Sequence, residues 1–167
     1  IKELKEWGKW YIDTTGLDGF RLDAVKHIRS EFYPEWLECL RRYKEKNLFA
    51  VGEYWSTSID TISEFINKTD GCMSLFDVPL HYNFYRASIS NGEYNMSQIF
   101  DGTIVKKYPE KAVTFVDNHD TEPGQALESF ILDWFKPLAY SLILLRKNGL
   151  PCVFYGDYYG IPEKSVS

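Results

Sequence analysis

The fold of this chain is decided by the stretch Asp18-Gly19-Phe20-Arg21-Leu22-Asp23-Ala24-Val25-Lys26-His27-Ile28. Its apolar residues predict a short buried strand, in which successive side chains point to opposite faces. The strand would then carry Arg21 and Asp23 side by side on one face. A guanidinium keeps a neighbouring carboxylate ionised, as covalent attack on an electrophilic carbon requires. The alternative is a buried Arg–Asp pair that only fixes the strand register, since such pairs also occur without any chemistry.

These residues resemble a signature motif of the α-amylase family of glycoside hydrolases. The family pattern is G-F-R-x-D-A-x-K-H, and it is matched by Gly19, Phe20, Arg21, Asp23, Ala24, Lys26 and His27. Two more family motifs follow in the family's order, Gly52-Glu53-Tyr54-Trp55 and Phe115-Val116-Asp117-Asn118-His119-Asp120. The resemblance extends over essentially the whole chain and favours chemistry over a purely structural ion pair.

The composition indicates a globular protein segment, with 167 residues and a net charge of -5. No basic region invites nucleic acid, and the longest apolar run, 138–145, is too short to span a bilayer. We therefore expect neither a nucleic-acid nor a membrane partner, and a monomer. The chain opens inside an amphipathic pattern with no initiator Met, so we interpret it as an internal fragment of a longer protein.

The cysteines bear on the cellular compartment. Cys39, Cys72 and Cys152 are widely spaced and form no C-x-x-C pattern, which argues against a disulfide framework or a zinc site. Three free thiols favour a reducing compartment. The cytoplasm is therefore favoured over secretion, which stays the alternative.

Helical and strand-like patterns alternate along the chain. Helices are expected at about 1–16, 34–46, 58–67 and 133–149, and strands at 19–24, 48–54, 72–80, 112–116 and 151–155. The region 82–101 is expected to hold one or two helices around a loop. Alternation of this kind predicts parallel βα units, which build either an open doubly wound sheet or a closed barrel.

Charged residues at the C-terminal ends of three strands favour the barrel, where catalytic groups converge on one rim. A complete barrel usually needs about 250 residues. The predicted fold is therefore α/β, a partial TIM (β/α)8 barrel with approximately strands four to eight. Residues 1–167 would be the C-terminal part of a catalytic barrel domain, without the earlier strands, the inserted domain and the C-terminal β domain.

Two further carboxylates have surroundings that suit catalysis. Large aromatic neighbours of Glu53 would desolvate its carboxyl and raise its pKa, so that it could deliver a proton near neutral pH; the alternative is a glutamate that faces solvent. Polar residues directly after the strand at 112–116 are costly to bury unless paired or functional. Asp117 and Asn118 are expected to shape the loop, and His119 and Asp120 to reach a substrate.

The family resemblance implies a role for each residue. Asp23 would be the nucleophile that forms a covalent glycosyl–enzyme intermediate, Glu53 the general acid and then base, and Asp120 the third carboxylate, which distorts the sugar and stabilises developing charge. Substrate contacts are implied for Arg21, which also keeps Asp23 ionised, and for Lys26, His27, Trp55 and His119.

The resemblance also bears on ions. The main-chain carbonyl of His27 matches a position that ligates a structural calcium in the family, but one carbonyl cannot hold the ion, so calcium is implied for the longer parent protein. Residues 150–160 contain no Arg or Lys, and we expect no chloride dependence.

The expected activity is endo-acting hydrolysis of α-1,4-glucosidic bonds in starch, glycogen and maltodextrins with retention of configuration. The alternatives are an exo-acting maltooligosaccharide-forming hydrolase, a transglycosylase of the same family, or a non-catalytic carbohydrate-binding relative. The fragment alone, with an incomplete active site, is expected to be inactive.

Overall fold

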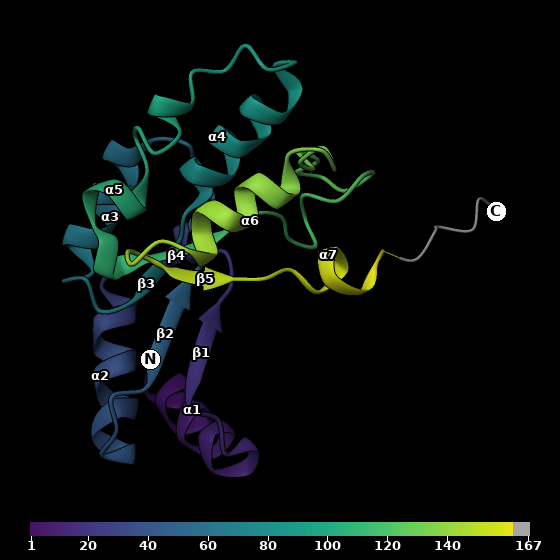
Figure 1. Ribbon diagram of the computed structural model, residues 1–167. Coiled ribbons are helices and arrows are strands. Elements are labelled where there is room, and N and C mark those ends of the chain that lie inside the picture. The colour runs from purple at the N-terminus through teal and green to yellow at the C-terminus, as the bar shows by residue number, and fades with distance from the viewer. Residues whose placement is uncertain (162–167) are drawn as a thin grey trace. The chain divides into compact units, whose positions relative to one another are not determined.

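The computed structural model describes residues 1–161 (Figure 1), which divide into two compact units between Phe76 and Asp77. Each unit contains parallel strands linked by helices. Within the described residues no helix is both long enough and apolar enough to cross a membrane.

The first unit contains three parallel strands. They are β1 (Gly19–Leu22), β2 (Phe49–Gly52) and β3 (Ser74–Phe76), with β2 between the other two. The helices are α1 (Lys2–Thr15), α2 (Phe32–Lys44) and α3 (Ile59–Lys68), with a 3₁₀ turn η1 (Val25–His27) after β1. Each strand is followed by a helical element that returns the chain to begin the next parallel strand.

Local sequence sets where these helices end. Gly16 adopts a left-handed conformation (φ 67°) and donates its N–H to the Ile12 carbonyl, which ends α1. The Ser58 hydroxyl accepts from the Thr61 amide and caps the start of α3. The buried stripe of α2, which includes Trp36, Leu37 and Leu40, packs into the core.

Two glycines allow the strands of the first unit to pack closely. A Cβ on Gly19 would lie 2.6 Å from the Phe49 carbonyl oxygen, and a Cβ on Gly52 would lie 2.7 Å from the Met73 sulfur. Gly52 is the last residue of β2, so this close packing fixes the strand directly before Glu53.

The second unit contains two parallel strands, β4 (Ala112–Phe115) and β5 (Leu150–Cys152). Its helices are α4 (Val78–Ile89), α5 (Ile104–Lys107), α6 (Lys136–Leu144) and α7 (Tyr155–Tyr159), with 3₁₀ turns η2 (Met96–Gln98) and η3 (Pro109–Lys111). The strand β4 is buried along its whole length. It leads directly into the loop that contains His119 and Asp120.

Several predicted strand boundaries were wrong, and the strand predicted at 48–54 is Phe49–Gly52. The strand predicted at 19–24 ends at Leu22. The strand predicted at 72–80 is only Ser74–Phe76, because the Asp77 side chain accepts from the Leu80 amide and starts α4 there. The strand predicted at 151–155 is Leu150–Cys152, and the chain turns into α7 at Tyr155.

Candidate active site

The turn after β1 directs Asp23 out of the sheet. Ala24 has a left-handed backbone (φ 46°, ψ 43°), which a non-glycine residue rarely adopts and which costs on the order of 1 kcal/mol. Asp23 therefore lies on a turn and its side chain is 71% exposed. The prediction that it shares a strand face with Arg21 was wrong, yet the Arg21 Nη1 still donates to its Oδ1 over 2.6 Å.

Glu53 follows β2 and is held from two sides. Its amide donates to the Leu22 carbonyl (2.9 Å) and its carbonyl accepts from the Val25 amide (3.0 Å), which extends the β1–β2 pairing by one step. Its Oε2 accepts from Arg21 Nη2 at 3.0 Å and from the Ala24 amide at 3.4 Å. Only 7% of Glu53 is exposed.

Burial raises the pKa of the Glu53 carboxyl above its ordinary value. The Ala24 amide and the Arg21 guanidinium act in the opposite direction, and the neighbouring Asp23 adds to the rise. The Arg21 guanidinium thus contacts two carboxyl groups. The carboxyl of Glu53 is buried and retains its proton to higher pH, whereas the carboxyl of Asp23 faces solvent. Such a pair can supply a proton donor and a nucleophile at adjacent strand ends.

Two of the expected substrate contacts lie beside each other in the same unit. The Lys26 ammonium donates to the Trp55 main-chain carbonyl over 3.2 Å, which links η1 to the segment after Glu53. The Tyr54 ring packs against Phe65, with ring centroids 4.8 Å apart, and so belongs to the core packing of α3. His27 is the last residue of η1 and is exposed.

The His27 carbonyl lies at the end of η1. Among residues 1–161, no three His, Cys, Asp or Glu side chains are grouped so that they could hold a metal ion. Calcium takes about six to eight oxygen ligands, so one carbonyl alone cannot hold the ion.

The second unit contains the other predicted site residues. The Asp120 side chain is 39% exposed, and its Oδ2 lies 3.3 Å from His119 Nε2. Its amide donates to Asn118 Oδ1 over 2.9 Å, and the Thr121 amide donates to the same oxygen over 3.0 Å. Asn118 thus shapes the loop, as expected from the sequence. The structure brings Asp23 and Glu53 together in one unit and Asp120 and His119 together in the other.

Sequence reasoning missed two buried ionisable residues, Asp77 and His81. The Asp77 carboxylate accepts from the amides of Leu80, Ile104 and Val105, and burial still raises its pKa to about 6. His81 has no exposed surface, and its two ring nitrogens bond the Val116 carbonyl (2.6 Å) and the Ser129 hydroxyl (2.8 Å). Both residues order the second unit.

We predict that His81 makes the protein less stable in acid. Burial lowers its pKa from 6.5 to about 4, so the unfolded chain binds the proton more readily than the folded one. The resulting loss of unfolding free energy between pH 6.5 and about 4 approaches about 3 kcal/mol. Urea unfolding at several pH values should show a shallower acid decline for His81→Gln. An equal decline in the wild type and the variant would contradict this assignment.

These features place the chain in the class of parallel α/β proteins that hold carboxylates at the carboxyl ends of their strands, where such folds place their active sites. Residues 1–167 match a family model whose description is "Alpha amylase, catalytic domain". The chain therefore belongs to the α-amylase catalytic-domain family.

Three curated relatives agree with this membership. The chain is 59% identical to an alpha-amylase of Geobacillus stearothermophilus, 55% to a glucan 1,4-alpha-maltohexaosidase of Bacillus sp. (strain 707) and 52% to a cytoplasmic alpha-amylase of Escherichia coli (strain K12). Each match covers 99% of this chain but only 30%, 32% and 33% of the respective relative. The chain thus spans about a third of the length of these relatives.

A solved structure supports the fold. The crystal structure of an Anoxybacillus alpha-amylase matches 96% of this chain and 36% of its own with a TM-score of 0.70, at 23% sequence identity. This likeness confirms the predicted α/β fold class, a part of a (β/α)8 barrel.

Proposed function

We propose that the protein containing this chain is an endo-acting hydrolase of α-1,4-glucosidic bonds in starch, glycogen and maltodextrins that retains anomeric configuration. The observation that supports this proposal most is that Arg21 contacts both Asp23 and Glu53 at adjacent strand ends. Retaining glycosidases need two neighbouring carboxyl groups, one that acts as the nucleophile and one that donates a proton. The family membership and the names of the relatives support the same substrate class.

In the proposed reaction, the Asp23 carboxylate attacks the anomeric carbon while Glu53 donates its proton to the departing glycosidic oxygen. The glycosidic bond breaks and a covalent glycosyl ester of Asp23 forms. Glu53, now ionised, removes a proton from water, and the resulting attack releases the sugar and restores both carboxyl groups. This mechanism needs the two carboxyl groups about 5 to 5.5 Å apart in the complex with substrate.

Other residues are proposed to bind the sugar. Asp120 would distort the ring and stabilise the oxocarbenium-like transition state, and His119 would hydrogen-bond sugar hydroxyls beside it. Lys26, His27 and Trp55 would contact the sugar on the leaving-group side.

The product profile of the whole protein on a long maltodextrin tests this function. Endo action predicts a rapid fall in chain length with a mixture of oligosaccharides, and NMR should detect α-anomers as the first products. The relative named as a maltohexaosidase favours one alternative, an exo-acting enzyme that would release a single short product from the start. New α-1,4 linkages instead of reducing ends would indicate a transglycosylase, and no reaction a carbohydrate-binding protein.

The proposal also covers calcium binding, chloride dependence and the cellular compartment. We propose a structural calcium in the parent protein, no activation by chloride, and a monomeric protein in the cytoplasm. Cys39 and Cys152 are free thiols, which fits a reducing compartment. The cytoplasmic relative of Escherichia coli supports the same location, whereas secretion remains the alternative.

A further inference from the structure

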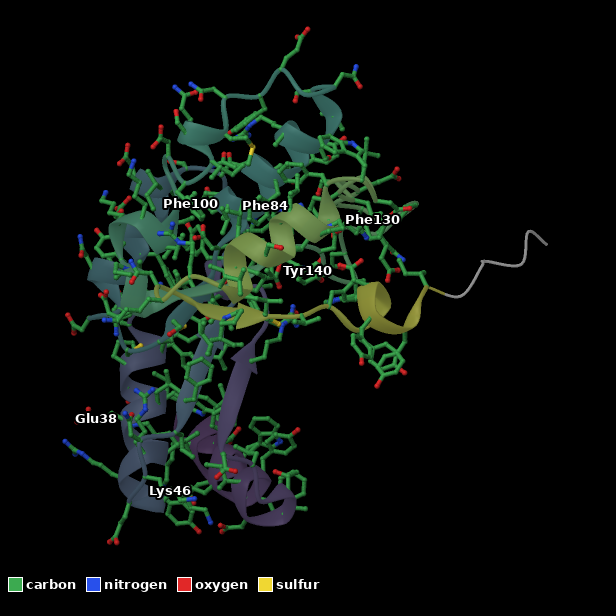
Figure 2. The ribbon with its side chains drawn as sticks, in the orientation of Figure 1. Glu38, Lys46, Phe84, Phe100, Phe130 and Tyr140 are labelled. Atoms are coloured by element: carbon green, nitrogen blue, oxygen red, sulfur yellow. The ribbon has the colours of Figure 1, made fainter. Side chains whose placement is uncertain are left out.

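Lys136 holds a buried cluster of charges in the second unit. It is the first residue of α6, and its side chain is 14% exposed. The ammonium lies 3.4 Å from Asp117 Oδ2, forms an ion pair with Asp157 and sits 3.3 Å from the centroid of the Phe130 ring. Figure 2 labels Phe130, which lies in the segment before α6. Lys136 thus connects Asp117, two residues after the end of β4, with Phe130 near the end of the following loop and with Asp157 in α7.

Asp117 closes the loop that contains Asp120. Its side chain has no exposed surface; Oδ1 accepts from the Thr121 hydroxyl (3.0 Å), and both oxygens lie 3.3 Å from the Ile131 amide. The Ser129 amide also donates to the Thr121 carbonyl over 3.1 Å. The two ends of the loop 117–131 are therefore joined at the carboxylate that Lys136 contacts.

The other carboxylate of the cluster is fixed as well. The Tyr140 hydroxyl, on α6 (Figure 2), donates to Asp157 Oδ2 over 2.6 Å and accepts from the Phe154 amide over 3.4 Å. Asp157 has little exposed surface. Lys136 therefore contacts two carboxylates that are each fixed by other groups, and it cannot move without disturbing both.

We propose that Lys136 is a positioning residue for Asp120, which acts by holding the loop 117–131 through Asp117. The inference rests on the proposed function, in which Asp120 stabilises the transition state. Removing the ammonium would leave two buried carboxylates without a counter-charge. Burial raises the pKa of Asp117 to about 7, with Asp157 adding to the rise and Lys136 opposing it. Without Lys136, this pKa would rise further, so that a larger share of Asp117 would be protonated or displaced at neutral pH.

The experiment compares Lys136→Met, which keeps the length and apolar stem, with the wild type in the whole protein. We expect kcat to fall about 10- to 100-fold with KM nearly unchanged, because a displacement of about 1 Å at a catalytic group has such an effect. Hydrogen exchange at the Asp120 and Ile131 amides should become faster. Lys136→Arg, which keeps the charge, should restore part of kcat. Lys106→Met, which removes an exposed ion pair with Asp101, is the matched control.

Each outcome decides between a positioning role and a purely structural one. A folded Lys136→Met protein with wild-type kcat and wild-type exchange, whatever its stability, overturns the inference. If Lys136→Met does not fold, Asp157→Asn is tested instead, because it removes one partner of Lys136; we expect it to lower kcat as well. Unchanged kcat and unchanged hydrogen exchange in Asp157→Asn would also overturn the inference. If the wild type hydrolyses no α-glucan, the proposed function fails, and the exchange data alone decide whether Lys136 holds the loop.

Discussion

Replacing Glu53 with glutamine in the whole protein should lower kcat on maltodextrin by about 10²- to 10⁴-fold, the usual effect of losing a general acid. Glutamine keeps the size of the side chain and an oxygen that can accept from Arg21, but it has no acidic proton to donate. Substrates with a good leaving group need little protonation of the departing oxygen. Their rate of glycosidic bond cleavage should therefore fall much less, and the measurement is kcat for both kinds of substrate.

The pH dependence provides a second readout for Glu53. Burial raises its pKa, and only the protonated form can act as the acid. Activity of the wild type should therefore persist above the ordinary pKa of glutamate and fall as the pH rises through the raised value. In Glu53→Gln this alkaline decline should disappear.

A matched control is available in the first unit. Glu38, labelled in Figure 2, is exposed on α2 and pairs with Arg42. Glu38→Gln should therefore leave kcat and the pH profile unchanged. Equal activity of Glu53→Gln and the wild type would show that Glu53 is not the proton donor.

Much of the candidate site could be predicted from the sequence because the relevant residues lie close to strand ends. Buried parallel strands are short apolar runs, and the first polar residue after such a run must lie at the carboxyl edge of the sheet. This reasoning located Glu53 after β2 and Asp117 after β4. The spacing of two residues between Arg21 and Asp23 likewise predicted their contact, which the structure contains.

Backbone conformation was harder to predict than residue location. A period of two places Asp23 in the strand, but the chain leaves β1 at Leu22 and Ala24 turns left-handed. Alanine gives no local signal for that conformation, whereas glycine would. Contacts with Glu53 hold it there, since the Ala24 and Val25 amides both donate to that residue. These contacts join positions distant in sequence.

Asp77 and His81, two buried polar residues of the second unit, could not be found from local patterns. The strand predicted at 72–80 includes Pro79, but proline is also favoured in the first turn of a helix, which is its place in α4. The Asp77 carboxylate accepts hydrogen bonds from main-chain amides of α5, which lies further along the chain. The two ring nitrogens of His81 form hydrogen bonds with the Val116 carbonyl and the Ser129 hydroxyl. Nothing next to either residue in the sequence indicates these partners.

Replacing Asp23 with glycine should lower kcat about 10⁴- to 10⁶-fold, as loss of a covalent nucleophile does. The side chain is largely exposed and pairs with Arg21, so we expect the fold and substrate binding to persist. Glu53 would still be present to protonate a leaving group. The removed carboxyl group would also leave space for a small anion beside the anomeric carbon.

Azide tests this assignment chemically. In Asp23→Gly, azide should attack the anomeric carbon from the side that the carboxylate occupied, as Glu53 protonates the departing oxygen, and yield a β-glycosyl azide. In Glu53→Ala the glycosyl ester of Asp23 would form first from an activated substrate, and azide would then yield the α-anomer. The two anomers can be distinguished by NMR. If Asp23→Gly retained wild-type kcat, or yielded the α-azide, Asp23 could not be the nucleophile, because each of these results requires a different group at the anomeric carbon.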